Sequence, residues 1–231
     1  MPCSWLFVGV IAAIAVFVAA SCSTQSRVSN EAPVTVAAER SPAPAAVDMR
    51  PRIVAFGDSL TAGYGLPPSD SYPAQLQKLL DDQGYQYEVV NAGVSGETTA
   101  GGLRRIDSAL DGDVRVVIVG LGGNDALRGL PPTELKKNLD GIVGKARSGG
   151  AKVLLAGMEA PPMMGPEYTT AFRNVYRDVA AEQHVAEIPF LLAGVAGIDD
   201  LNQADGIHPN AKGAAIVARN VYEHLSPMLA R

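Results

Sequence analysis

The chain has 231 residues, of which 47% are hydrophobic and 19% charged, a composition typical of one globular domain with a buried core. Its formal net charge is −5, and no basic stretch interrupts the sequence, which argues against nucleic acid as a partner. The only cysteines, Cys3 and Cys22, lie close to the N-terminus, so the folded domain contains no disulfide and must be stabilised by packing.

The N-terminus resembles an export signal. Residues 1–24 contain no charged side chain, and their apolar stretch is shorter than the roughly 20 residues of a membrane-spanning helix. The stretch ends in Ala19–Cys22, which resembles a bacterial lipobox, whose cysteine is lipidated and becomes the mature N-terminus. We expect a signal peptide over 1–22 and a lipid anchor at Cys22, on the periplasmic side of the cell envelope. A signal cleaved without lipidation, an uncleaved anchor and a misassigned start are the alternatives.

The next segment, 23–50, is rich in Ala, Pro and Ser and has no apolar period, which predicts a tether. A single domain is expected over 51–231. Within it, apolar runs predict strands at 53–56, 87–90, 114–121, 152–156 and 185–188. Amphipathic segments between them predict helices at 71–83, 98–110, 133–147, 168–183 and 210–225, with Ser71 and Asn210 as caps. This alternation predicts a parallel sheet covered by helices on both faces.

Four short blocks carry the chemistry, and each follows a predicted strand or precedes the last helix. They are Gly57–Leu60, Asn91–Gly93, Gly122–Asp125 and Asp205–Pro209. In parallel sheets, ligands bind beyond the carboxyl ends of the strands, where these blocks are expected to meet.

Ser59 is the candidate nucleophile, placed after the first strand by the turn at Gly57. A serine hydroxyl needs an adjacent base to take its proton. The segment is not the G-x-S-x-G elbow of the α/β-hydrolases, because Thr61 stands at the second glycine position. Seen alone, a serine after a strand is more often a helix cap.

His208 is the candidate base, and Asp205, three residues earlier, can orient its imidazole. The other two histidines, His184 and His224, have charged neighbours and are expected at the surface. The alternative interpretation of Asp205 and His208 is a turn carboxylate and a capping histidine.

Acyl transfer also needs hydrogen-bond donors for a developing oxyanion. The candidates are the backbone N–H of Gly93, the side-chain amide of Asn124 and the N–H of Ser59; an ordinary glycine turn and an Asx turn are the alternatives. Metal chemistry is not indicated, because no third ligand accompanies Asp205 and His208 at a metal-binding spacing. No G-x-G-x-x-G or P-loop indicates a nucleotide.

At these residues the domain resembles the SGNH/GDSL hydrolase superfamily, close to its arylesterase and multifunctional thioesterase/lysophospholipase branch. The longest matching pieces are Phe56–Tyr64, Gly120–Asp125 and Asp205–Asn210. The resemblance implies a three-layer α/β/α, flavodoxin-like fold with a five-stranded parallel sheet of order 2-1-3-4-5. It implies no cofactor, a role for Asp58 in bracing the nucleophile loop, and the functional set Ser59, His208, Asp205, Gly93 and Asn124.

The expected activity is a serine esterase acting on aryl and short- to medium-chain acyl esters, with thioesters and lysophospholipids as further substrates. Two loops, 64–67 and 160–165, are expected to rim the site and to bind the acyl group through Tyr64, Leu66, Met163 and Met164. Leu127 and Leu130 are expected to extend this groove. Alternatively, these side chains only cover the sheet edge. A carbohydrate O-deacetylase is the second candidate function, and a non-catalytic lipoprotein that binds acyl chains or glycans is the third. The sequence leaves the oligomeric state open.

Overall fold

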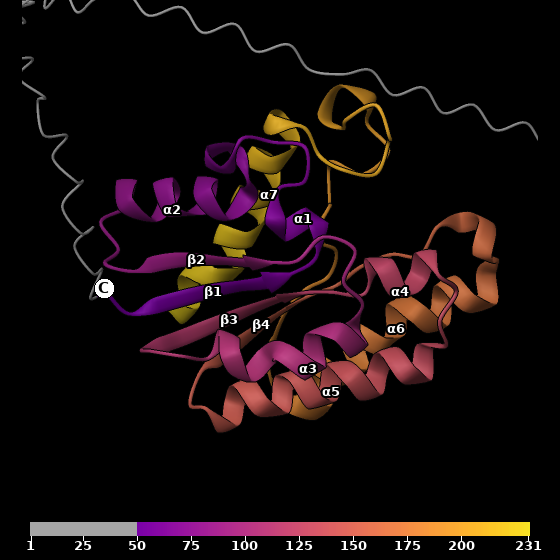
Figure 1. Ribbon diagram of the computed structural model, residues 1–231, viewed down its shortest axis with the longest axis horizontal. Helices are drawn as coiled ribbons and strands as arrows, with labels where there is room; N and C mark the ends of the chain where they lie inside the picture. Colours follow the sequence, from indigo (N-terminus) through magenta and orange to yellow (C-terminus); the bar gives the residue numbers. More distant parts are fainter. Residues whose placement is uncertain (1–49) are drawn as a thin grey trace, which may run out of the picture. The chain divides into compact units, whose positions relative to one another are not determined.

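The computed structural model describes residues 50–231. The expectations for the signal peptide, for Cys22 and for nearly all of the tether fall outside these residues. The described part contains a five-stranded parallel sheet of order β2-β1-β3-β4-β5, as predicted (Figure 1). The strands are β1 Arg52–Gly57, β2 Glu88–Gly93, β3 Val114–Gly120, β4 Lys152–Ala156 and β5 Ala186–Ile188.

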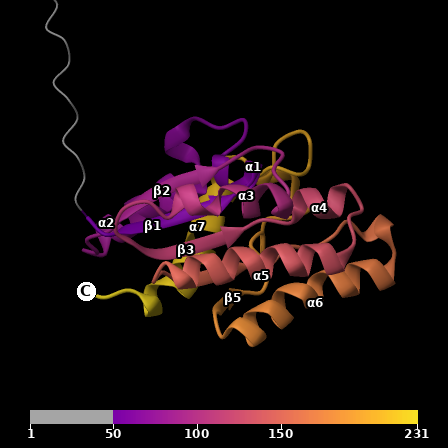
Figure 2. The same cartoon turned by 60° about the horizontal axis from the view of Figure 1, so that its bottom comes forward.

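Helices cover both faces of the sheet. They are α1 Ser59–Ala62, α2 Tyr72–Asp82, α3 Thr99–Ala109, α4 Gly123–Leu127, α5 Pro132–Ser148, α6 Pro166–Gln183 and α7 Ala211–Leu225. Helices α2 and α7 pack together on one face, and α3, α5 and α6 form the layer on the other (Figures 1 and 2). The central strand β3 is buried from Val116 to Gly120, because a strand between two helical layers has no solvent-facing side. The three-layer expectation is confirmed.

The carboxyl ends of β1, β2 and β3 are aligned at three glycines. Gly57 pairs with Gly93 of β2 and with Gly120 of β3. Helix α1 lies directly against them: a Cβ on Gly57 would stand 2.0 Å from Thr61 Oγ1, and one on Gly93 would stand 2.2 Å from the Ala62 nitrogen. Absence of side chains at these two strand ends therefore lets α1, and with it Ser59, approach the sheet edge.

Most predicted elements are present with shifted ends. Strand β2 continues three residues beyond the predicted end at Val90, because Asn91–Gly93 keep parallel pairing with β1 despite their polar or small side chains. The one-turn helices α1 and α4 were not predicted, since segments this short have no apolar period.

The two predicted helix caps differ in outcome. The Asn210 side chain accepts hydrogen bonds from the backbone nitrogens of Lys212 and Gly213, which confirms it as the cap of α7. Ser71 stands at the capping position of α2, but its hydroxyl donates to the Pro68 carbonyl at 2.9 Å, so its predicted capping bond is wrong. Among residues 50–231, no helix combines the length and the apolar character needed to cross a membrane.

Candidate active site

Ser59 is the first residue of α1, immediately beyond the end of β1. The preceding Asp58 caps this helix, since its Oδ1 accepts from the Leu60 nitrogen at 3.0 Å. The backbone N–H of Ser59 is in the first turn of α1, where N–H groups have no intrahelical acceptor. The short helix therefore presents both the Ser59 hydroxyl and a backbone donor at the sheet edge.

His208 reaches Ser59 from the loop before α7. Its Nε2 lies 2.9 Å from Ser59 Oγ, and its Nδ1 lies 2.7 Å from Asp205 Oδ2. With the carboxylate accepting from Nδ1–H, the Nε2 lone pair faces the serine hydroxyl, which is the arrangement a general base needs. Residues 149 positions apart in sequence are thus in hydrogen-bond contact.

The Asp205 carboxylate is fixed from three sides. Its Oδ1 accepts from the backbone nitrogens of Ile207 at 2.9 Å and His208 at 3.0 Å, while Oδ2 contacts the imidazole. The backbone bond from His208, followed by the imidazole and the Ile207 bond, lowers the pKa of Asp205 to about 2. Asp205 is therefore an anion throughout the neutral pH range.

Asn124 lies in α4, beyond the end of β3, and its Nδ2 donates to Asp58 Oδ2 at 3.2 Å. Asp58 is 1% exposed, and this burial raises the pKa of its carboxyl to about 6, against the opposing bonds from Leu60 and Asn124. The Asp58 carboxylate thus caps α1 through one oxygen and binds the Asn124 side-chain amide through the other. Both contacts are in line with the bracing role that the family resemblance implied.

Gly93 ends β2 beside Ala62 of α1. Its N–H donates to Asn91 Oδ1 at 3.0 Å, so this candidate oxyanion donor already has an acceptor. The structure therefore brings Ser59, His208 and Asp205 into direct contact, and it places Gly93 and Asn124 at the ends of the two strands that flank β1.

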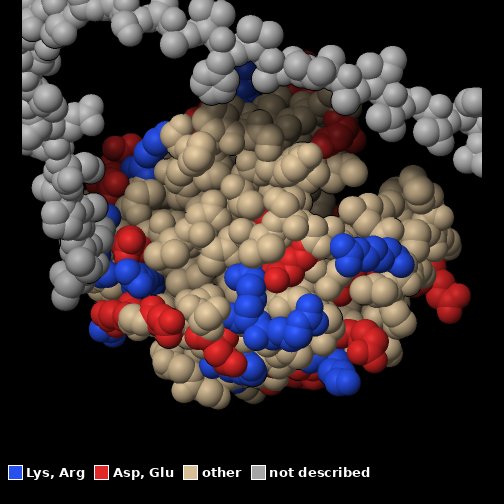
Figure 3. Space-filling view, viewed as in Figure 1, with Lys and Arg blue, Asp and Glu red and all other residues tan. Residues whose placement is uncertain are grey.

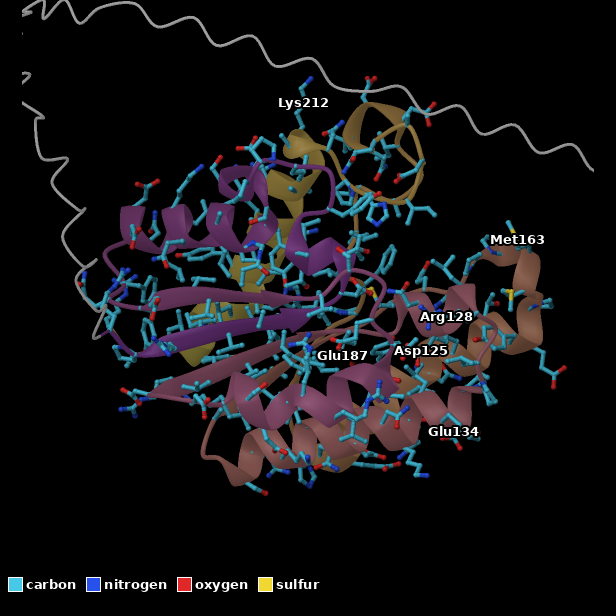
Figure 4. The ribbon with its side chains drawn as sticks, viewed as in Figure 1. Asp125, Arg128, Glu134, Met163, Glu187 and Lys212 are labelled. Atoms are coloured by element: carbon cyan, nitrogen blue, oxygen red, sulfur yellow. The ribbon has the colours of Figure 1, made fainter. Side chains whose placement is uncertain are left out.

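A buried network behind α4 was missed in the sequence. Asp125 Oδ2 accepts from the Thr99 nitrogen at 2.9 Å, its Oδ1 accepts from the Thr99 hydroxyl at 2.6 Å, and Asn138 donates to that hydroxyl at 3.2 Å. Asp125 belongs to α4 and lies on the side of α4 that faces α3 (Figure 4). Its carboxylate caps α3 and thereby fixes the position of α4, which carries Asn124. The position of Asp125 directly after Asn124 in the Gly122–Asp125 block was the sequence signal for this network.

Two predicted substrate-binding residues lie beside Ser59 and His208. The Tyr64 ring is tilted against the His208 ring with centroids 4.8 Å apart, and Tyr64 and Leu66 line a narrow cavity with Ser59 and His208. Gln203 Nε2 donates to the Tyr64 carbonyl at 2.7 Å and fixes this loop.

The other predicted apolar residues are more peripheral. Leu127 is 54% exposed on α4, and Met163 is 88% exposed at the outer turn before α6 (Figure 4). Met164, just before α6, lies near Gly129, and the Tyr168 hydroxyl of α6 donates to the Leu130 carbonyl. The segment around the start of α6 therefore contacts the loop between α4 and α5.

The charged side chains visible in Figure 3 gather over α3 and α5, and the surface over β2 and α1 is largely uncharged.

His184 is exposed as predicted, whereas His224 is half-buried with its Nδ1 2.9 Å from the Asn220 carbonyl. Within residues 50–231, no three His, Cys, Asp or Glu side chains gather in a way that would hold a metal ion.

Comparisons with known proteins identify the family of this chain. A family model described as GDSL-like Lipase/Acylhydrolase family matches residues 55–216. Esterase TesA of Pseudomonas aeruginosa is 47% identical over 178 residues, which cover 77% of this chain and 89% of the relative. Thioesterase 1/protease 1/lysophospholipase L1 of Escherichia coli strain K12 is 35% identical over 178 residues, covering 77% and 84% of the two chains.

A solved crystal structure of TesA matches this fold with a TM-score of 0.75 at 46% identity, over 77% of this chain and 99% of the other. The resemblance to SGNH/GDSL hydrolases is thereby confirmed. The chain belongs to the GDSL-like lipase/acylhydrolase family and is a carboxylic ester hydrolase.

Proposed function

We propose that this enzyme hydrolyses esters through a Ser59–His208–Asp205 triad and an acyl-enzyme intermediate. The observation that carries the proposal is the continuous contact from Ser59 Oγ to His208 Nε2 at 2.9 Å and from Nδ1 to Asp205 at 2.7 Å. A nucleophile, its base and an orienting anion are the parts that acyl transfer requires.

In the proposed reaction, Ser59 Oγ attacks the ester carbonyl carbon while His208 Nε2 takes the hydroxyl proton. The carbonyl oxygen becomes an oxyanion, which accepts hydrogen bonds from Ser59 N–H, Gly93 N–H and Asn124 Nδ2. Collapse expels the leaving group, which takes the proton from His208. Water then attacks the acyl-Ser59 carbonyl carbon while the same imidazole takes its proton. The bond from this carbon to Ser59 Oγ breaks, Oγ takes the proton back from His208, and the carboxylic acid leaves. Asp205 stabilises the imidazolium in both steps.

The direct test is the Ser59→Ala variant of the full chain. We expect turnover of p-nitrophenyl butyrate and covalent labelling by a fluorophosphonate probe to be abolished, because the Ser59 hydroxyl is the proposed nucleophile and lies in hydrogen-bond contact with His208 Nε2. The matched control is Ser148→Ala, at the end of α5, which should keep both activities. Undiminished hydrolysis by Ser59→Ala would refute the proposed nucleophile.

We propose aryl and short- to medium-chain acyl esters as the preferred substrates, with thioesters and lysophospholipids as further ones. The support is a set of exposed apolar side chains in the loops and short helices beyond the carboxyl ends of the strands, which suits an acyl group: Tyr64, Val94, Leu127, Met163, Met164 and Ile207. The names of the esterase and thioesterase relatives point the same way. A series of p-nitrophenyl esters from acetate to decanoate, with matching thioesters, tests this preference. Inert esters together with turnover of acetylated sugars would favour the carbohydrate O-deacetylase.

For location, we propose export and lipid anchoring at Cys22, on the lipobox-like sequence that ends there. Metabolic labelling with a palmitate analogue should mark the wild type and leave Cys22→Ala unlabelled. Label that persists in Cys22→Ala would contradict the anchor.

A further inference from the structure

Arg105 of α3 reaches the strand ends next to the proposed oxyanion site. Its Nη2 donates to the Ala92 carbonyl at 2.9 Å and to the Gly57 carbonyl at 3.2 Å. These residues immediately precede Gly93 and Asp58 in the chain. One guanidinium therefore contacts the backbone at the end of β1 and at the end of β2.

The contact with Ala92 bears directly on Gly93. The Ala92 carbonyl and the Gly93 N–H belong to one planar trans peptide, in which the two groups point in opposite directions. A donor that holds the carbonyl oxygen therefore also fixes the direction of the N–H. A charged donor polarises the same peptide and strengthens its N–H as a hydrogen-bond donor.

The guanidinium is itself fixed. Its Nε lies 2.9 and 2.8 Å from the two carboxylate oxygens of Glu97, and Nη2 contacts the second of these oxygens. Its Cζ lies 4.0 Å from the centre of the Phe56 ring. The side chain of Glu97 is 10% exposed, and that of Arg105 is 24% exposed. A planar fork held by a carboxylate and a ring face has little freedom to rotate, which suits a positioning role.

The Gly57 carbonyl connects the Ser59 turn to the end of the strand that carries Gly93. Gly57 O accepts from Arg105 and also from the Val94 nitrogen at 2.9 Å. The turn that carries the nucleophile and the strand end that carries Gly93 are thus joined at one oxygen. Movement of Arg105 would shift Ser59 and Gly93 relative to each other, and a misplacement of about 1 Å can lower a rate about 100-fold.

We propose that Arg105, oriented by Glu97, is a positioning residue that sets and polarises the Ala92–Gly93 peptide, whose N–H stabilises the oxyanion. This inference rests on the proposed function, because it assigns a task to a residue behind the same site. Arg105 touches neither substrate nor nucleophile and acts through Gly93.

The test compares Arg105→Gln with Arg52→Gln. Arg52 forms a similar partly exposed ion pair with Glu88, 2.8 Å between Nε and Oε2, at the opposite ends of the same two strands. For Arg105→Gln we expect kcat with p-nitrophenyl butyrate to fall about 10- to 100-fold while KM changes less than about threefold. Arg52→Gln should keep kcat and KM, even where it lowers the melting temperature equally.

Inhibition by an alkylboronic acid gives a readout that a purely structural role would not change. Its tetrahedral adduct on Ser59 is an anionic boronate with a hydroxyl oxygen in the place of the oxyanion, so we expect its inhibition constant to rise in Arg105→Gln by about the factor lost in kcat. Arg105→Lys, which keeps the charge but not the fork, should fall between wild type and Arg105→Gln.

Three results would overturn the inference: Arg105→Gln with the kinetics of Arg52→Gln, a raised KM at unchanged kcat, or unchanged boronate affinity at reduced kcat. Should Arg105→Gln not fold, Glu97→Gln replaces it under the same criteria, with an expected three- to tenfold loss of kcat. Failure of the proposed function can be distinguished from failure of this inference. It would appear as surviving esterase activity in Ser59→Ala, independently of the kinetics of the Arg105 variants.

Discussion

The Asn124 side chain combines an observed contact with a proposed role. Its amide is a candidate oxyanion donor, and one of its hydrogens already bonds to Asp58 at 3.2 Å. That bond orients the amide before substrate arrives, so the donor needs little rearrangement during the reaction.

Replacement of Asn124 by alanine should lower kcat about 100- to 1,000-fold, the usual effect of losing one oxyanion donor. KM should change little, because the donor acts mainly on the transition state. Steady-state kinetics with thermal unfolding measure both effects. An Asn124→Ala protein that is folded and fully active would remove Asn124 from the oxyanion site.

Asp58 makes a pH-dependent contribution to stability. Burial raises the pKa of its carboxyl from 3.8 to about 6, so between these values the folded state binds more protons than the unfolded state. The contribution of Asp58 is therefore fully present below about pH 4, and it is lost as the pH rises through about 6. The total change for this group is about 3 kcal/mol, at 1.36 kcal/mol per pKa unit.

In Asp58→Asn this pH dependence should disappear. The free energy of unfolding of the variant, relative to wild type, should therefore increase between about pH 4 and pH 6, as urea titrations would show. Asp205 does not obscure the result, because its pKa is lowered to about 2 and its own contribution changes between about pH 2 and 4. A difference that stays constant between pH 4 and 6 would contradict the raised pKa of Asp58.

At the level of secondary structure, the glycine row at the strand ends determines how closely α1 approaches the sheet. Gly93→Ala would bring a Cβ to 2.2 Å from the Ala62 nitrogen, a backbone atom that cannot move alone. We expect a loss of about 2–4 kcal/mol in the free energy of unfolding, as for other strained core substitutions, together with a reduced kcat because α1 carries Ser59.

The control for this prediction is Gly144→Ala in α5, where an added Cβ meets nothing within 4 Å. It should stabilise the helix by up to about 1 kcal/mol and leave kcat unchanged. Equal stability of Gly93→Ala and Gly144→Ala would show that the strand-end glycine is not needed for packing.

The sequence predicts the larger elements well, because buried parallel strands have uninterrupted apolar runs, as in Val116–Val119. It predicts Ser59, Asp205 and His208 as candidates through their blocks, and the structure adds their contacts. Arg105 and Glu97 could not be found in this way. A carboxylate before a helix and a guanidinium in its middle look like solvated surface charges until the fold places backbone carbonyls beside the guanidinium.

At the scale of the whole domain, segments far apart in sequence must stay in register at one sheet edge. Gln203, in the His208 loop, donates to the Tyr64 carbonyl at 2.7 Å and to the Pro209 carbonyl at 3.0 Å. Gln203 connects the His208 loop to the loop after Ser59, and the Tyr64 ring in turn contacts His208.

Gln203→Ala should therefore lower kcat/KM about tenfold, because His208 loses its fixed place relative to Ser59. The melting temperature should change little, since Gln203 lies outside the apolar core of the described domain. The rate of fluorophosphonate labelling measures this alignment directly. Wild-type labelling of Gln203→Ala would show that the two loops are positioned independently.

The bond between the Gly93 N–H and Asn91 Oδ1 has a consequence for selectivity between reaction states. A neutral ester carbonyl is no stronger an acceptor than the amide oxygen that Gly93 already has, so exchanging one for the other gains almost nothing on substrate binding. An oxyanion is the stronger acceptor and displaces the amide. In the proposed mechanism the Asn91 side chain thus competes with the substrate carbonyl for the Gly93 N–H, but the oxyanion of the tetrahedral intermediate replaces it. The free energy of this exchange is released during the chemical step.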